Sequence, residues 1–168
     1  MVPLSVLGLN WCVHGSRWLL ALYDPQQGRL LQISVSPADA VMLGQVLAGQ
    51  PSERSGLYTL VGALLRQQPQ LASIHLALDA PDRARTALVL SNDGGRRTYP
   101  TSTADGVALA IRAGLPIYAD EQLLERFGIG GSAESPPDTE CAPGTSPIPA
   151  AFRRALEDTG PEPPAGET

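Results

Sequence analysis

The chain has 168 residues, of which 43% are hydrophobic and 17% are charged, and its formal net charge is −5. This length suits one globular domain with its own core and leaves too little chain for a second of ordinary size. Residues 1–127 hold ten acidic and ten basic side chains, whereas residues 128–168 hold seven acidic side chains and two arginines. The first region is therefore neutral overall, which excludes a protein that binds nucleic acid through a broad basic surface and leaves only a local basic face.

Strand-like segments open the chain. Residues 4–9 are apolar, and residues 18–23 (WLLALY) and 30–35 (LLQISV) flank the sequence DPQQG at 24–28. Proline and glycine in a short gap between two β-rich runs predict a β-hairpin.

A first helix is predicted directly after this hairpin. Ser36 supplies a capping hydroxyl, Pro37 suits the first helical position, and Asp39 places a carboxylate in the first turn. Apolar residues follow at helical spacing until Gly49 and Pro51, which end the helix.

A second helix is predicted over residues 57–68, before Pro69. Five apolar side chains fall at i, i+3, i+4, i+7 and i+8, which predicts a single buried stripe. They are Leu57, Leu60, Val61, Leu64 and Leu65.

The remaining elements of the domain alternate between strands and helices. Residues 74–78, 85–90 and 96–99 are strand-like, and the sequence NDGG at 92–95 predicts a tight turn between the last two. A third helix begins with STAD at 102–105 and ends near Gly114, a short strand covers 117–119, and a last helix after Asp120 is closed by Gly128. These patterns predict an α+β domain over residues 1–127, in which helices pack on a mixed β-sheet.

The remaining sequence, residues 128–168, has the composition of a disordered segment. It contains eight prolines and few branched apolar residues. We expect a Pro-rich acidic tail that is mostly disordered, with a short amphipathic helix near 149–157 that is marginal without neighbours. The chain shows neither a targeting segment nor an apolar run long enough for a membrane, so a cytoplasmic protein without membrane association is expected.

Two stretches resemble the bifunctional nuclease (BFN) domain family. Residues 31–40 (LQISVSPADA), with the helix that follows, are similar to the family's IWIGPAEA…ALEG stretch. Residues 104–118 (ADGVALAIRAGLPIY) are similar to its SDAIALALRxGxPIYV stretch, which is the more specific of the two. The resemblance covers residues 4–127 in order and implies the same mixed α+β fold. It also implies an activity on RNA and DNA.

Several polar positions of the family pattern differ in this chain. Before the third helix the family has DARPSDA, and this sequence keeps only the last acid, Asp105. At the second helix the family's THDLL is matched by LYTLV at 57–61, so Tyr58 occupies the position of the histidine. The apolar scaffold is kept while polar positions have been replaced.

Asp39 and Asp105 are the candidate catalytic and metal-binding residues. Each lies in the first turn of a predicted helix, and Mg²⁺ can be held by one or two carboxylates with water and substrate phosphates completing its shell. The alternative is that each carboxylate caps its own helix and interacts favourably with the helix dipole.

Arginines supply the candidate nucleic-acid contacts. Four of them lie on the predicted hairpin, where guanidiniums could bind phosphates bidentately or could simply keep a solvated face charged. They are Arg83, Arg85, Arg96 and Arg97. Arg112, on the third helix, matches the family pattern and is the fifth candidate.

Two functions remain open on the sequence alone. One is metal-dependent phosphodiester hydrolysis of RNA or DNA, with Asp39 and Asp105 positioning Mg²⁺. The alternative is a catalytically degenerate family member that acts as a binding or regulatory module. A homodimer is expected in either case.

Overall fold

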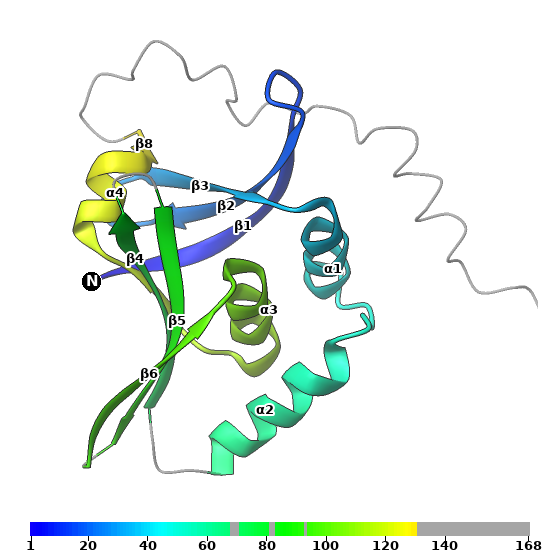
Figure 1. The fold of residues 1–168 in the computed structure, drawn as a ribbon, viewed down its shortest axis with the longest axis vertical. Helices are drawn as coiled ribbons and strands as arrows, with labels where there is room; N and C mark the ends of the chain where they lie inside the picture. Colours follow the sequence, from blue (N-terminus) through cyan, green and yellow to red (C-terminus); the bar gives the residue numbers. More distant parts are fainter. Residues whose placement is uncertain (68–70, 81–82, 93, 131–168) are drawn as a thin grey trace, which may run out of the picture.

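A computed structural model describes residues 1–67, 71–80, 83–92 and 94–130 of the chain. Eight strands form one mixed sheet in the order β6-β5-β4-β7-β1-β2-β3-β8 (Figure 1). Neighbouring strands are antiparallel except β4 and β7, which are parallel. The sheet with its packed helices confirms the α+β single-domain fold predicted from the sequence. The predicted disordered tail and its short helix near 149–157 lie outside the described residues.

Four helices lie between the strands in the described part of the chain. The strands are β1 (Val2–Cys12), β2 (Arg17–Asp24), β3 (Arg29–Val35), β4 (Leu71–Ala80), β5 (Arg83–Asn92), β6 (Gly95–Thr101), β7 (Ile117–Ala119) and β8 (Gly128–Ile129). The helices are α1 (Pro37–Leu47), α2 (Ser55–Gln67), α3 (Thr103–Ala113) and α4 (Glu121–Phe127). β8 pairs with β3, so Gly128 and Ile129, which the sequence placed in the tail, take part in the sheet.

The β2–β3 hairpin is held by a buried carboxylate. Asp24 is fully buried, and its side chain accepts hydrogen bonds from the backbone N–H groups of Gln26 and Gln27. Arg29 Nε donates to Asp24 Oδ2 at 3.0 Å, and Arg29 Nη1 donates to Glu121 of α4 at 2.6 Å. Although burial by itself raises the pKa of Asp24, these hydrogen bonds hold its pKa below the ordinary value. The network therefore joins the hairpin turn to α4.

Helices α1 and α3 pack on one face of the sheet, and α2 packs against α3 (Figure 1). α1 contacts β1 and β2, while α3 contacts β4 and β5. The close packing of α3 depends on Gly106, because a Cβ at this position would lie only 2.9 Å from Thr86 Cγ2 and 3.1 Å from Thr101 Cγ2. The side chains that are almost completely buried between these layers include Leu20, Leu22, Leu31, Leu43, Ile74, Leu76 and Val107.

The predicted buried stripe of α2 is wrong for three of its five side chains. Leu57, Leu60 and Leu64 are exposed, whereas the buried residues of the helix are Tyr58 and Gly62. The helix instead approaches α3 through its smallest residue, since a Cβ at Gly62 would lie 2.9 Å from the Cβ of Ala113. These three leucines consequently point outward, while Val61 and Leu65 are half-buried. Among the described residues, no helix is both long and apolar enough to cross a membrane.

Candidate functional site

The two aspartates proposed from the sequence cap α1 and α3 in the same way. Ser36 donates its hydroxyl to Asp39 at 2.7 Å, and the N–H of Asp39 donates back to Ser36 Oγ at 3.1 Å. Ser102 and Asp105 repeat this exchange at 2.7 and 3.0 Å. Each serine and aspartate pair thus completes the first turn of its helix, as the sequence predicted.

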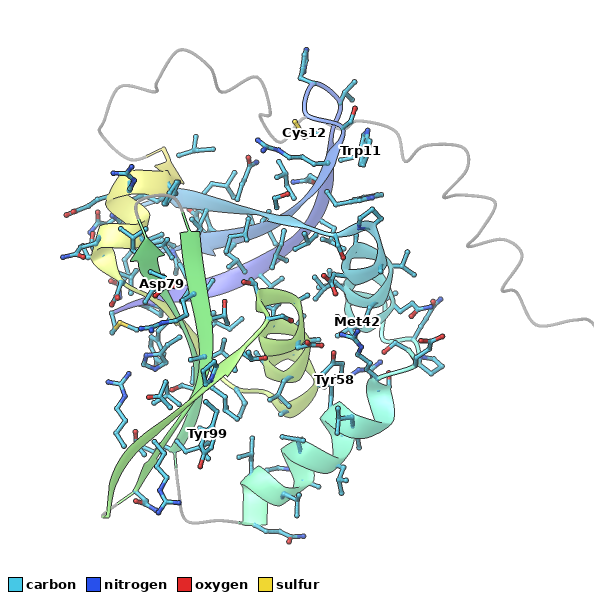
Figure 2. All side chains as sticks on the ribbon, viewed as in Figure 1. Trp11, Cys12, Met42, Tyr58, Asp79 and Tyr99 are labelled. Carbon is cyan, nitrogen blue, oxygen red and sulfur yellow. The ribbon has the colours of Figure 1, made fainter. Side chains whose placement is uncertain are left out.

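Asp105 differs from Asp39 because α2 and the loop before it supply further donors. Arg54 Nη1 and the Tyr58 hydroxyl each donate to Asp105 Oδ1 at 2.7 Å. The Tyr58 hydroxyl also lies 3.6 Å from the sulfur of Met42, and Figure 2 shows the tyrosine side chain between α2 and α1. The start of α3 is therefore tied to α2 by a small polar cluster, which we call the Asp105 cluster: Arg54, Tyr58, Ser102 and Asp105.

The cluster keeps Asp105 ionised and Tyr58 protonated. Partial burial raises the pKa of Asp105, but the hydrogen bonds from Tyr58, Ser102 and Arg54 outweigh it, and the pKa lies below the usual value. Burial, followed by the hydrogen bond to Asp105, raises the pKa of Tyr58 to about 12. At neutral pH Tyr58 is thus a hydrogen-bond donor that orients the carboxylate, and it is not available as a base.

Two depressions open on either side of Arg54. One, of about 340 Å³, is bordered by Asp39, Val41 and Gln45 of α1 and by Glu53 and Arg54 of the following loop. The other, of about 460 Å³, lies between α2, α3 and the end of β6. Its lining residues are Arg54, Leu57, Tyr58, Val61, Thr101, Asp105 and Leu109. Arg54 borders both depressions, so the two aspartates face adjoining parts of one surface.

The residues present fit a magnesium ion only through a minimal set of protein ligands. Within the described ranges, no group of three or more His, Cys, Asp or Glu residues comes together. Oδ1 of Asp105 already accepts two hydrogen bonds and Oδ2 accepts one, which leaves the carboxylate about one further acceptor site. Mg²⁺ is often bound by one carboxylate with water and substrate phosphates, and Asp105 satisfies that requirement.

Two of the hairpin arginines, Arg85 and Arg96, make contacts away from the Asp105 cluster. Arg96 and Arg97 are neighbours on β6, so their side chains leave opposite faces of the sheet. Arg96 donates to His75 Nδ1 at 3.1 Å, and Arg85 lies 3.6 Å from Asp79. Arg83 begins β5, and its side chain lies outside the described part of the structure.

Arg112 lies close to the loop that precedes α2. Its guanidinium donates to the carbonyl oxygen of Gln50 and to Ser55 Oγ. Arg112 thereby fastens α3 to the loop that carries Arg54, and it supports the Asp105 cluster without taking part in it.

Sequence reasoning missed Arg54 altogether, because it lies in a loop without a motif and meets Asp105 across 51 positions of the chain.

A comparison with curated protein sequences returned no match. A comparison with protein families matched residues 20–131 to the bifunctional nuclease domain. This match spans two thirds of the chain and includes α1, α2 and α3. These helices carry Asp39, Tyr58 and Asp105, respectively. On this finding, and on the mixed α+β fold in which the matched segment lies, the chain belongs to the bifunctional nuclease domain family.

Proposed function

We propose that the surface around Arg54 and Asp105 binds RNA or DNA and hydrolyses phosphodiester bonds with the help of a divalent metal ion. The observation that carries this proposal is the contact between Arg54 and Asp105, which places an oriented, ionised carboxylate beside a guanidinium at an open depression. A carboxylate is a ligand for Mg²⁺, and a guanidinium is a ligand for phosphate.

The residues of the cluster have separate roles in this proposal. Asp105 would hold the metal ion, which would stabilise negative charge on the phosphoryl oxygens. Arg54, whose side chain is 52% exposed, uses the donors not directed at Asp105 to bind a phosphate oxygen. Tyr58 and Ser102 fix the orientation of the Asp105 carboxylate through their hydroxyl groups. Asp39 borders the adjoining depression and is the second carboxylate proposed to position the ion.

One observation favours a second function, binding without catalysis. Three donors already satisfy most of the Asp105 carboxylate, and no other acidic side chain of the described residues borders its depression. A site of this kind could bind a phosphate group through Arg54 and lack the carboxylates needed to hold a metal firmly. The domain would then serve as a nucleic-acid-binding or regulatory module.

Cleavage of single-stranded RNA and DNA in Mg²⁺, with EDTA as a control, distinguishes these functions. Asp105→Asn should reduce cleavage on the order of 100-fold, the scale of losing one stabilising group at a phosphoryl transition state. Asp39→Asn tests the second carboxylate in the same assay. Asp79→Asn is the matched control, because Asp79 is also paired with an arginine but lies far from Tyr58 (Figure 2).

Binding measurements complete the test. Arg54→Gln should weaken the binding of a labelled oligonucleotide whether or not the domain cleaves it. If Asp105→Asn cleaves at the wild-type rate, the metal-binding role assigned to Asp105 is rejected. Binding that depends on Arg54, in a protein that does not cleave under any of these conditions, favours the module.

A further inference from the structure

A second cluster of polar side chains lies on the face of the sheet that points away from α3, which Figure 1 shows on one side of β4 and β5. Ile74 of β4 faces α3, since its Cγ2 would lie 3.4 Å from a Cβ at Gly106. Side chains alternate along a strand, so Ser73 and His75 point to the opposite face. Tyr118 of β7 pairs with His75 in register, and the centroids of the two rings lie 5.5 Å apart. With one arginine of β6 these residues form the His75 cluster: Ser73, His75, Arg96 and Tyr118.

Arg96 reaches the cluster across the intervening strand β5. Its partner in the β5–β6 pairing is Ser91, whereas His75 is paired with Ala87, four positions further back along β5. Nη2 of Arg96 nevertheless lies 3.1 Å from Nδ1 of His75. Val89 lies between Ala87 and Ser91 on the same face and is only 2% exposed, which agrees with the aliphatic part of the arginine crossing over it. The guanidinium is therefore carried from the edge strand of the sheet to the histidine.

The two hydrogen bonds of His75 assign its tautomer. A guanidinium can only donate, so Nδ1 accepts from Arg96 and carries no proton. The proton of the neutral ring is then on Nε2, which donates to Ser73 Oγ at 2.9 Å. Burial, followed by the charge of Arg96, lowers the pKa of His75; the terminal amino group acts in the same direction, and Asp120 opposes them without reversing the shift. The imidazole is therefore a neutral group that lies beside a cation.

The His75 cluster offers hydrogen-bond donors and carries no negative charge. Because Ser73 accepts from the imidazole, its own hydroxyl hydrogen remains available to a ligand. Arg96 directs one of its five N–H groups at His75. Within the described ranges, neither Ser73 nor Arg96 has an acidic partner. Arg96 is exposed and the other three residues are half-buried, so a ligand can reach the cluster from solvent.

We propose that the His75 cluster binds a phosphate group, either as free phosphate or as a phosphate monoester. Such a group has several acceptor oxygens and close to two negative charges near neutral pH, which suit a guanidinium with a second cation beside it. Arg96 turns from Nδ1 of His75 to two phosphate oxygens, and the Ser73 hydroxyl donates to a third. His75 takes up a proton from solvent on Nδ1 and donates it to the phosphate, because the negative charge now favours the imidazolium.

The phosphate site is separate from the Asp105 cluster. The two lie on opposite sides of the sheet, because Asp105 begins α3 and the His75 cluster points away from that helix. Binding of phosphate at His75 therefore does not depend on the proposed hydrolysis, and each can fail without the other.

Proton NMR titration of the two histidines of the chain, His14 and His75, tests this inference. With inorganic phosphate at constant ionic strength, we expect a dissociation constant on the order of 1 mM. At saturation the pKa of His75 should rise by about one unit, because the bound negative charge stabilises the imidazolium. His14 lies in the turn between β1 and β2 and serves as the internal control. A His75 signal that phosphate leaves unchanged, or shifts no more than that of His14, overturns the proposal.

Variants of β6 and β4 show whether the response comes from the cluster. Arg96→Gln should abolish the response of His75 to phosphate, and it should raise the pKa of His75 without phosphate because a neighbouring cation is removed. Arg97→Gln is the matched control, since the next residue of β6 is also exposed but points to the opposite face, and it should leave the response intact. Ser73→Ala should weaken phosphate binding about fivefold. The amide spectrum of each variant establishes that the fold is kept, and an undiminished response in Arg96→Gln overturns the proposal.

Three ligands identify the source of the phosphate group. A nucleoside monophosphate that binds more tightly than inorganic phosphate supports the proposal with a nucleotide as the ligand, and equal or weaker binding supports it with free phosphate. An oligonucleotide without terminal phosphates offers only diesters, each with a single negative charge. If His75 responds to this oligonucleotide as strongly as to the monophosphate at equal phosphate concentration, the site is a contact for the nucleic-acid backbone and the proposal is overturned.

Discussion

Removing the Tyr58 hydroxyl is the sharpest perturbation of the Asp105 cluster. Tyr58→Phe keeps the aromatic ring in a site that is only 4% exposed, so the packing against Met42 is nearly preserved. The variant loses one hydrogen bond to a carboxylate, a class of bond that contributes about 1.5–3 kcal/mol to stability. Asp105 keeps its bonds from Arg54 and Ser102, and its side chain is 35% exposed, so water can replace part of the loss. We expect a loss at the lower end of that range, about 1.5 kcal/mol.

Urea unfolding of four proteins measures this contribution: wild type, Tyr58→Phe, Asp105→Ala and the double variant. If the hydroxyl and the carboxylate interact as the structure indicates, the losses of unfolding free energy in the two single variants add up to more than the loss in the double variant. We expect this difference, the coupling energy, to be about 1 kcal/mol. Tyr99→Phe is the matched control, because Tyr99 is 46% exposed on β6, and its unfolding free energy should change little. A coupling below about 0.3 kcal/mol, the range in which independent sites add, would refute the assigned contact.

Three further predictions concern stability. Gly106→Ala should cost about 1–2 kcal/mol in urea unfolding, since the added methyl lies 2.9 Å from the nearest side chain. Gly44 lies in α1 with open space around it, so Gly44→Ala should instead stabilise the protein by about 0.5–1 kcal/mol. Equal effects of Gly44→Ala and Gly106→Ala would contradict the close packing of Gly106. Arg29→Met leaves Asp24 buried without its charged partner and should cost about 3–5 kcal/mol, with a lowered thermal midpoint as the readout. The pKa values of Asp24 and Asp105 are lowered on folding, so their contribution to stability is fully present above the unfolded value of 3.8 and is lost as the pH falls through the folded values. An Asp105→Asn variant whose stability falls as steeply below pH 3.8 as that of the wild type would contradict this.

The local rules of the chain were sufficient for its elements up to α4, but not for β8, whose pairing with β3 is a long-range contact. The DPQQG turn, the serine caps of α1 and α3 and the glycine that ends α3 act within four residues or fewer, so their effect can be read from neighbouring positions. Proline and glycine signals likewise predicted where strands end. The resemblance to the bifunctional nuclease domain rested on these same segments, and the family match over residues 20–131 confirms it.

Tertiary packing decided which side of α2 is buried and which aspartate acquires partners. Periodicity predicted a stripe on α2 but could not say that Gly62, which has no side chain, would admit α3 and leave Leu57, Leu60 and Leu64 outside. The caps of Asp39 and Asp105 are alike in sequence.

Only the position of Arg54 and Tyr58 against α3 makes the two aspartates different. Contacts between residues about 50 positions apart depend on how whole helices fit together. That fit is set by side-chain volumes across several elements, and no short segment of the sequence contains this information.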